Sequence, residues 1–158
     1  GFASFRGLSL LDGSRQGVHR ITATHHAGHC VSRQFFKSIV SGTSKSVFES
    51  LVHVERGAAK SDSKQLNKNL VLSSSASAVS RPELKIYADD VACAHGSATG
   101  QIEANEIFYL RSRGISEADA RAIMTEGFAE EAIDDVSDPG LKAKLQALVK
   151  RRIAELLS

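Results

Sequence analysis

Residues 47–54 read Val47-Phe48-Glu49-Ser50-Leu51-Val52-His53-Val54, an alternation of apolar and polar side chains. The alternation returns in Leu84-Lys85-Ile86-Tyr87-Ala88. Because successive side chains of a strand point to opposite faces, both stretches predict half-buried β-strands. Similar β-rich runs stand between Gly, Ser, Asn and Asp residues. The sequence thus predicts strands over residues 18–24, 35–40, 47–54, 69–72 and 84–91.

The connections between these strands narrow the choice of β architecture. No stretch before residue 100 supplies the long crossover helices of a doubly wound parallel sheet, so antiparallel folds and a β-solenoid remain. Tight-hairpin dipeptides occur once, at Asp12-Gly13, which favours longer connections such as those of stacked coils. We expect the Ser-rich residues 73–80 to form a solvated corner between strands.

The spacing of apolar residues changes from a strand-like to a helical period near residue 103. Residues 103–113 predict a short helix closed by Gly114, and Ser116 with Asp119 predicts a capped second helix that runs to about Val136. Asp138-Pro139 is a start signal for a third helix. We expect the helices to bury their apolar faces against one another and the end of the β region, and any uncovered stripe to form a docking surface. The third stripe comprises Leu141, Leu145, Leu148, Val149, Ile153 and Leu156.

Composition excludes several classes of protein. The 158 residues carry 20 basic and 18 acidic side chains, and this net charge of +2 does not indicate a nucleic-acid-binding surface. The basic residues of the third helix are expected to form a solvated face. No apolar segment has the length of a membrane span, and two cysteines make no disulfide framework. We expect a reducing, soluble compartment. The absence of an initiator Met at Gly1 indicates a chain cut from something longer.

Cys93 and His95 form the main candidate site. Side chains two apart on a strand share a face, so this thiol and imidazole would present one soft ligand pair. Residues 24–30 hold a second group, in which His25 and His26 should face opposite sides of a strand. The weaker metal candidates there are His26, His29 and Cys30. The structural alternative for both groups is a buried thiol or a hydrogen-bonded histidine without a ligand role.

The chain shows no self-contained catalytic motif. It lacks a phosphate-binding loop, a dinucleotide fingerprint, a nucleophile elbow and an H-E-x-x-H zinc helix. Nucleotide hydrolysis would therefore come from a partner. Two further hypotheses remain open: a stand-alone metalloenzyme built on the histidines and cysteines above, and a structural β-solenoid interaction module without metal or ATPase partner.

An ordered series of segments resembles a known family. It begins with residues 8–13, continues through His26 and residues 32–36, and passes through residues 61–73 and 81–91 to Cys93, His95 and Gly96. In this order the segments resemble the SufB/SufD family of the SUF iron–sulfur cluster assembly machinery, and within it the SufD branch. The SufB branch carries a Glu-His-Glu-Ala type sequence at residues 93–96, and in the SufD branch Ser is usual where this chain has Ala94.

The resemblance implies a right-handed parallel β-helix over residues 1–100 and an α-helical domain over residues 101–158, as a C-terminal fragment. It implies a non-catalytic scaffold that pairs with SufB and docks the ATPase SufC, in the bacterial cytoplasm or a plastid stroma. No cofactor would be bound stably, although a transient cluster shared with SufB would use His95 first and Cys93 beside it. An isolated chain is a candidate homodimer. The candidate SufC-docking residues are Phe108, Tyr109, Leu110, Arg113, Gly114 and Phe128.

Overall fold

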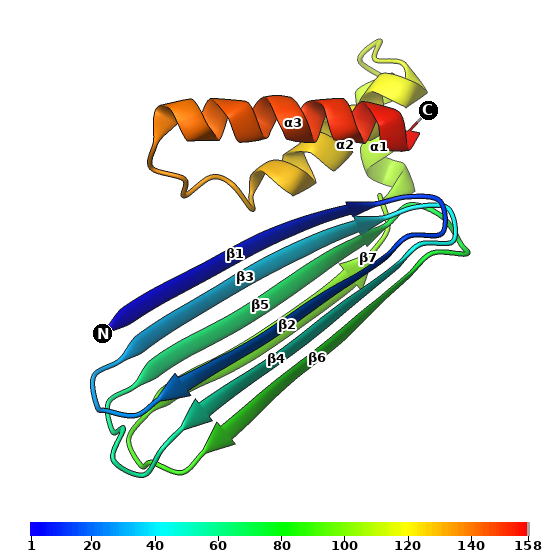
Figure 1. Ribbon diagram of the computed structural model, residues 1–158. Helices are drawn as coiled ribbons and strands as arrows, with labels where there is room; N and C mark the ends of the chain where they lie inside the picture. The colour runs from blue at the N-terminus through cyan, green and yellow to red at the C-terminus, as the bar shows by residue number, and fades with distance from the viewer. Residues whose placement is uncertain (158) are drawn as a thin grey trace.

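The strands form two sheets, each made of parallel strands, and the two sheets face each other. The computed structural model describes residues 1–157. Strands alternate between a sheet of order β1-β3-β5-β7 (sheet A) and a sheet of order β2-β4-β6 (sheet B), as Figure 1 shows. The strands are β1 (Phe2–Leu11), β2 (Gln16–His25), β3 (Val31–Val40), β4 (Lys45–Val54), β5 (Asp62–Val71), β6 (Ser77–Ile86) and β7 (Ala92–Gly100).

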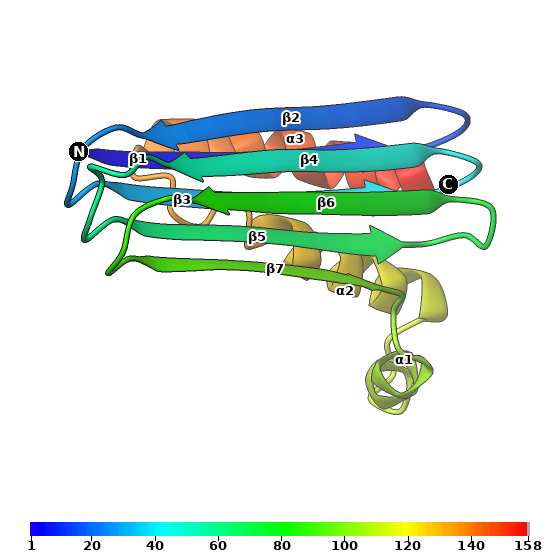
Figure 2. The same ribbon diagram turned by 90° about the horizontal axis from the view of Figure 1, so that it is seen from below.

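Each strand pairs with the strand two further along the chain, always in parallel. Val31 lies beside Asp62 and Asp62 beside Ala92, so the chain returns to the same position after about 30 residues. The result is a β-solenoid of about three coils, which confirms the solenoid prediction and excludes the antiparallel alternative. Figure 2 shows the strands side by side, with β7 at one end of the stack.

The corners of the solenoid repeat as the strands do. His29, Lys60 and Asp90 each have a positive φ, at 57°, 61° and 54°, just before β3, β5 and β7. The amide of His29 donates to the carbonyl of Ala59 at 3.0 Å, and the amide of Lys60 donates to the carbonyl of Asp90 at 2.8 Å. Each corner is thus hydrogen-bonded to the corner of the next coil. Hairpin signals are scarce in the sequence because these wide corners, and not tight hairpins, connect the strands.

Several strands extend beyond their predicted limits. β1 was not predicted, and β5 begins at Asp62 rather than residue 69. The prediction for residues 84–91 was wrong at its end, since β6 stops at Ile86 and a corner follows. Within the Ser-rich segment, residues 73–75 turn, but residues 77–80 belong to β6. The start of β5 was missed because of the polar interior described below: inward-facing Ser, Gln and Asn remove the apolar alternation that predicts a strand.

Three helices follow the last strand, and their starts agree with the sequence signals. They are α1 (Ala104–Arg111), α2 (Glu117–Glu130) and α3 (Pro139–Leu157). Gly114 ends the first helical segment with a φ of 85°. The hydroxyl of Ser116 accepts a hydrogen bond from the amide of Asp119, and the carboxylate of Asp138 accepts one from the amide of Leu141. Both are N-terminal caps.

Helix α2 ends earlier than predicted, at Glu130 rather than near Val136. The ammonium of Lys37, on the outer face of β3, donates to the carbonyl of Phe128 at 2.6 Å. In a continuing helix that carbonyl would accept from the amide of residue 132, but the amide of Ala132 donates to Ala129 instead. A side chain of the sheet thus terminates the helix.

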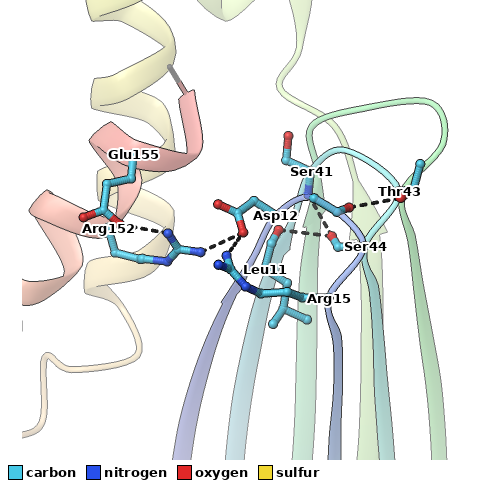
Figure 3. A network of polar contacts seen from close by, with 9 residues as sticks. Leu11, Asp12, Arg15, Ser41, Thr43, Ser44, Arg152 and Glu155 are labelled. Carbon is cyan, nitrogen blue, oxygen red and sulfur yellow. Dashed lines mark hydrogen bonds and ion pairs between the residues drawn. The ribbon is translucent and has the colours of Figure 1, made fainter.

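The main apolar core lies outside the solenoid, between sheet A and the helices. Its buried residues are Ile39, Leu70, Ala129, Val149, Ile153 and Leu156. Helices α2 and α3 therefore cover the outer face of sheet A rather than the end of the β region (Figure 1). The basic residue Arg152 of α3 is tied to the corner that follows β1: it donates to the carboxylate of Asp12 at 2.8 Å, and Arg15 and Glu155 complete the network in Figure 3.

Candidate functional site

The interior of the solenoid is polar along sheet A. Inward-facing residues of successive coils stack in columns, with Ser32 beside Ser63 and Gln34 beside Gln65. Their side chains are buried and bonded to one another and to sheet B: the amide of Gln65 donates to the hydroxyl of Ser50 at 2.6 Å, and that hydroxyl donates to Gln34. Buried polar groups of this kind are stable only when they are hydrogen-bonded, so the columns hold the coils in register.

Cys93 and His95 occupy the last position of two such columns. Cys93 lies beside Ser63 and His95 beside Gln65. The two side chains therefore share the inward face of β7, as their spacing predicted. Ser63 and Gln65 are 0% and 2% exposed, whereas Cys93 is half-buried and His95 is exposed. Within residues 1–157 no strand follows β7, so the interior is open at this end, and we refer to the face formed there by Cys93 and His95 as the open end.

The thiol of Cys93 is a free thiol in an apolar setting. It packs beside a buried cluster that includes Val52, Val54 and Ala88. This burial raises the pKa of the Cys93 thiol, and a hydrogen bond from the backbone of Ser63 lowers it by a smaller amount. Cys93 is therefore held mainly as a neutral thiol, which becomes a metal ligand only on losing its proton.

The second candidate group, His26, His29 and Cys30, lies in the corner between β2 and β3, which does not bring the three side chains into one site. His26 is exposed and its Nδ1 lies 2.9 Å from a carboxylate oxygen of Glu55. His29 is the left-handed corner residue, and Cys30 accepts a weak hydrogen bond from the amino terminus at 3.6 Å. Within residues 1–157 no group of three or more His, Cys, Asp or Glu side chains is placed to hold a metal ion. A metal or cluster at Cys93 and His95 would thus need ligands from elsewhere.

His25 is the residue of this segment that sequence analysis did not select. As expected, it faces the opposite side from His26, and it lies buried at the end of β2 inside the solenoid. Its Nε2 lies 2.8 Å from the hydroxyl of Ser32. Burial lowers the pKa of His25, with a smaller contribution from the positively charged amino terminus. The signal that could have found it is its position at the inward end of an alternating strand.

The candidate docking residues fall into two sets. Phe108 and Tyr109 of α1 are 72% and 55% exposed, and the guanidinium of Arg113 lies 4.8 Å from the centre of the Tyr109 ring. Gly114 is also exposed, and Leu110 is half-buried. Figure 2 shows α1 standing away from the two sheets, at the end where β7 lies. The second set is Phe128 alone, which packs between α2 and sheet A.

A groove lies between α1, α2 and the outer face of the last coil. Its volume is about 580 Å³. Apolar side chains of Leu70, Ile102, Met124 and Phe128 line it, and Lys68 and Glu106 are the charged residues at its wall. Among residues 1–157 no helix has the length and apolar character needed to span a membrane.

Comparison with known proteins agrees with the resemblance. Residues 1–128 match the family model described as SUF system FeS cluster assembly, SufBD core domain. That range includes all seven strands, α1 and most of α2.

Curated relatives extend the match. The chain is 42% identical over 129 residues to the iron-sulfur cluster assembly protein SufD of Escherichia coli K12, covering 82% of this chain and 30% of the relative. It is 40% identical over 149 residues to an iron-sulfur cluster assembly SufBD family protein of Synechocystis, covering 94% and 33%. A SufD protein of Plasmodium falciparum is 38% identical over 141 residues, with coverage of 88% and 10%.

The chain thus spans about a third of the length of the first two relatives. The family model covers more than half of the chain, and the solenoid accounts for most of the matched residues. This chain belongs to the SufBD family of the SUF iron–sulfur cluster assembly system and is SufD-like within it.

Proposed function

We propose that this chain is part of a non-catalytic scaffold subunit that pairs with SufB at the open end of the solenoid and docks the ATPase SufC on α1. The observation that carries the proposal is the placement of Cys93 and His95 on the inward face of β7, where the polar columns end and the interior is open. A second subunit placed against this end would meet both side chains.

The number of ligands supports a shared site. Iron–sulfur clusters are usually held by four protein ligands, mostly thiolates, with imidazole as an accepted replacement. Cys93 and His95 supply two. A nascent cluster, which is the cargo of the system, would complete its ligand set from SufB and remain transient because neither subunit holds it alone.

The backbone at the same end supports pairing. β6 and β7 are the last strands of their sheets, so one edge of each has no neighbour among residues 1–157. Unpaired edges are templates for strand addition by another chain. A second copy of this chain would meet the same edge, which makes the homodimer a competing outcome in the absence of SufB.

The exposed aromatic pair on α1 supports docking of a partner. Aromatic and Arg side chains are enriched among the residues that contribute most of the binding energy of an interface. Phe108 and Tyr109 are exposed on α1, which projects from the sheets, and Arg113, just after this helix, lies over the Tyr109 ring. Phe128 is not part of this surface, since it is already packed against Lys37.

The two free thiols agree with a reducing compartment, for which we propose the cytoplasm or plastid stroma.

Anaerobic reconstitution with SufB and SufC tests the proposal. We expect His95→Ala to lose most of the cluster yield while both partners still copurify. The matched control His26→Ala, which removes an exposed imidazole at a distant corner, should retain full yield. Phe108→Ala combined with Tyr109→Ala should lose SufC but retain SufB. Normal cluster yield in His95→Ala would overturn the ligand assignment, and retention of SufC by the double variant would overturn the docking surface.

A further inference from the structure

Two basic side chains of sheet A bind the backbone at the C-terminal end of α2. The ammonium of Lys37 donates to the carbonyl of Phe128 at 2.6 Å, and the guanidinium of Arg6 donates to the carbonyl of Glu131 at 3.2 Å. Arg6 lies beside Phe35 in the register of β1 and β3, so the two cations share the outer face of sheet A. In a continuing α-helix, both carbonyls would accept hydrogen bonds from amides four residues further along the chain.

Residues 131–136 follow α2 in tighter turns. The amides of Ala132, Ile133 and Val136 donate to carbonyls three residues back, at 3.0, 2.8 and 3.1 Å. Glu131 has a φ of −54° and a ψ of −27°. This spacing and these angles are of the 3₁₀ type, which differs from an α-helix by a small change in each backbone dihedral. The segment is therefore close in conformation to an extension of α2.

The sequence of the segment permits an α-helix. Residues 131–136 contain no Gly or Pro, and the first residue that interrupts a helix is Pro139. Ala132 and Ile133 also continue the apolar stripe of α2, which is why the sequence predicts a helix to about Val136. The donors from sheet A, rather than the local sequence, decide where α2 ends.

Ion pairs keep both donors in place. Lys37 pairs with Glu131, and Arg6 pairs with Asp135. In an extended α2, these carboxylates would lie in its last turns, where the helix dipole disfavours negative charge. The charge of the two basic side chains therefore favours the present conformation, and a variant that tests their role has to remove that charge.

The conformation of residues 131–136 sets the place of α3. An α-helix rises about 1.5 Å and turns about 100° per residue, whereas a 3₁₀-helix rises about 2.0 Å and turns about 120°. Over the whole segment, conversion to an α-helix would move the start of α3 by about 3 Å and rotate it by about 120°. Val149 and Ile153 of α3 would then leave the cluster that they form with Ile39 and Leu70.

We propose that Lys37 and Arg6 form a conformational stop that fixes the length of α2. While both side chains hold their carbonyls, α2 ends at Glu130 and α3 lies on sheet A. When both are released, α2 continues to Val136, and α3 leaves the sheet and uncovers its outer apolar face. The inference goes beyond the proposed function, since it concerns the helices on sheet A and neither the open end nor α1.

The test is NMR spectroscopy of the full chain that carries both Lys37→Met and Arg6→Met. Methionine keeps an unbranched apolar stem and removes the charge and the donors. We expect nuclear Overhauser effects between residues four apart through Val136, as in an α-helix. Amides of Val149 and Ile153 should exchange at least about tenfold faster, because a helix that has lost its packing opens more often.

Two variants serve as controls. Lys68 donates to the carboxylate of Glu131 at 2.8 Å, and its side chain is 34% exposed. Lys68→Met should therefore keep both the 3₁₀ turns and the exchange rates of α3. Ile153→Ala weakens the packing of α3 without touching the stop, so it should speed exchange in α3 and leave the turns at residues 131–136 unchanged.

The outcomes decide between a stop and a purely local contact. An α-helix through Val136 in the double variant, with the turns kept in both controls, supports the stop. Turns that stay of the 3₁₀ type in the double variant overturn it, as does an extended α2 in Ile153→Ala. An extended α2 with unchanged exchange in α3 overturns the link to α3.

If the double variant does not fold, Lys37→Met alone decides. A hydrogen bond from the amide of Ala132 to the carbonyl of Phe128 supports the stop, and retention of its bond to Ala129 overturns it.

Discussion

The two faces of sheet A differ in the side chains that they bury. The face that looks into the solenoid carries Ser, Gln and Asn columns beside the buried Phe36 and Val40, whereas the face that looks outward is covered by α2 and α3 over an apolar cluster. Burial of apolar surface is the main source of stability, so the outer cluster should contribute much of the stability that holds these helices on the sheet. The hydrogen-bonded columns of the interior keep the coils in register and end at Cys93 and His95.

The largest effect expected from this comparison concerns the outer cluster. Ile153 of α3 is 0% exposed and belongs to that cluster. Ile153→Ala removes buried methyl and methylene groups and leaves a cavity, so we expect a loss of about 2–5 kcal/mol in the free energy of unfolding. Urea denaturation measures it.

The matched control lies on the same helix. Leu148 is 50% exposed, so Leu148→Ala should cost less than about 1 kcal/mol. Equal losses of unfolding free energy in the two variants would show that the outer cluster does not hold α3 on sheet A, and they would contradict the difference drawn between the two faces.

A somewhat smaller effect is expected at the one cation buried in the outer interface among the described residues. The side chain of Lys37 is 0% exposed, pairs with Glu131 and lies 3.9 Å from the centre of the Phe128 ring. Burial lowers the pKa of Lys37, and the bonded Glu131 opposes this shift. Lys37→Ala leaves the carbonyl of Phe128 without its donor, so we expect a loss of about 2–3 kcal/mol.

Lys68 makes the comparison sharp, since it pairs with the same carboxylate at 2.8 Å but is 34% exposed in its side chain. Lys68→Ala should cost less than about 1 kcal/mol, because exposed ion pairs contribute little. If the loss in Lys68→Ala matched that in Lys37→Ala, burial would not be what gives Lys37 its effect. Both values come from the same urea titrations.

The smallest effect concerns pH. Hydrogen bonds from Lys37 and Lys68 hold the pKa of Glu131 below its ordinary value of 4.5. A carboxyl with a depressed pKa in the folded state stabilises the fold above its unfolded pKa, and this contribution is lost as pH falls through the folded pKa. We expect Glu131→Gln to lose less stability than the parent chain between about pH 5 and about pH 3. Parallel acid titrations followed by circular dichroism would contradict this if the two curves coincided.

The strands are predictable from the sequence where apolar alternation survives and are not predictable where the inward-facing residues are polar. Residues 47–54 were assigned correctly because Phe48, Val52 and Val54 fill the sheet B side of the interior. The start of β5 was missed because Ser63, Gln65 and Asn67 face inward there. Helix starts were found because caps such as Ser116 are local, whereas the end of α2 depends on Lys37, more than ninety residues away in the chain.

The candidate site was predicted in part. The shared face of Cys93 and His95 follows from a spacing of two on a strand, and the structure confirms it. Their place at the open end could not be read from local spacing, because it depends on which strands stack and which strand is last. The hydrogen bonds that join His25 to Ser32 and Ser32 to Ser63 were not predicted for the same reason, since the repeat of the coils brings these residues together.

The central claim is that the open end at β7 receives a second subunit of the family. Amide hydrogen exchange of the full chain, measured with and without SufB, tests it most directly. We predict that amides of β7 exchange at least about tenfold more slowly when SufB is bound, while those of β1 at the opposite end of sheet A keep their rates. Unchanged exchange across β7 in a complex shown to contain SufB would contradict the account.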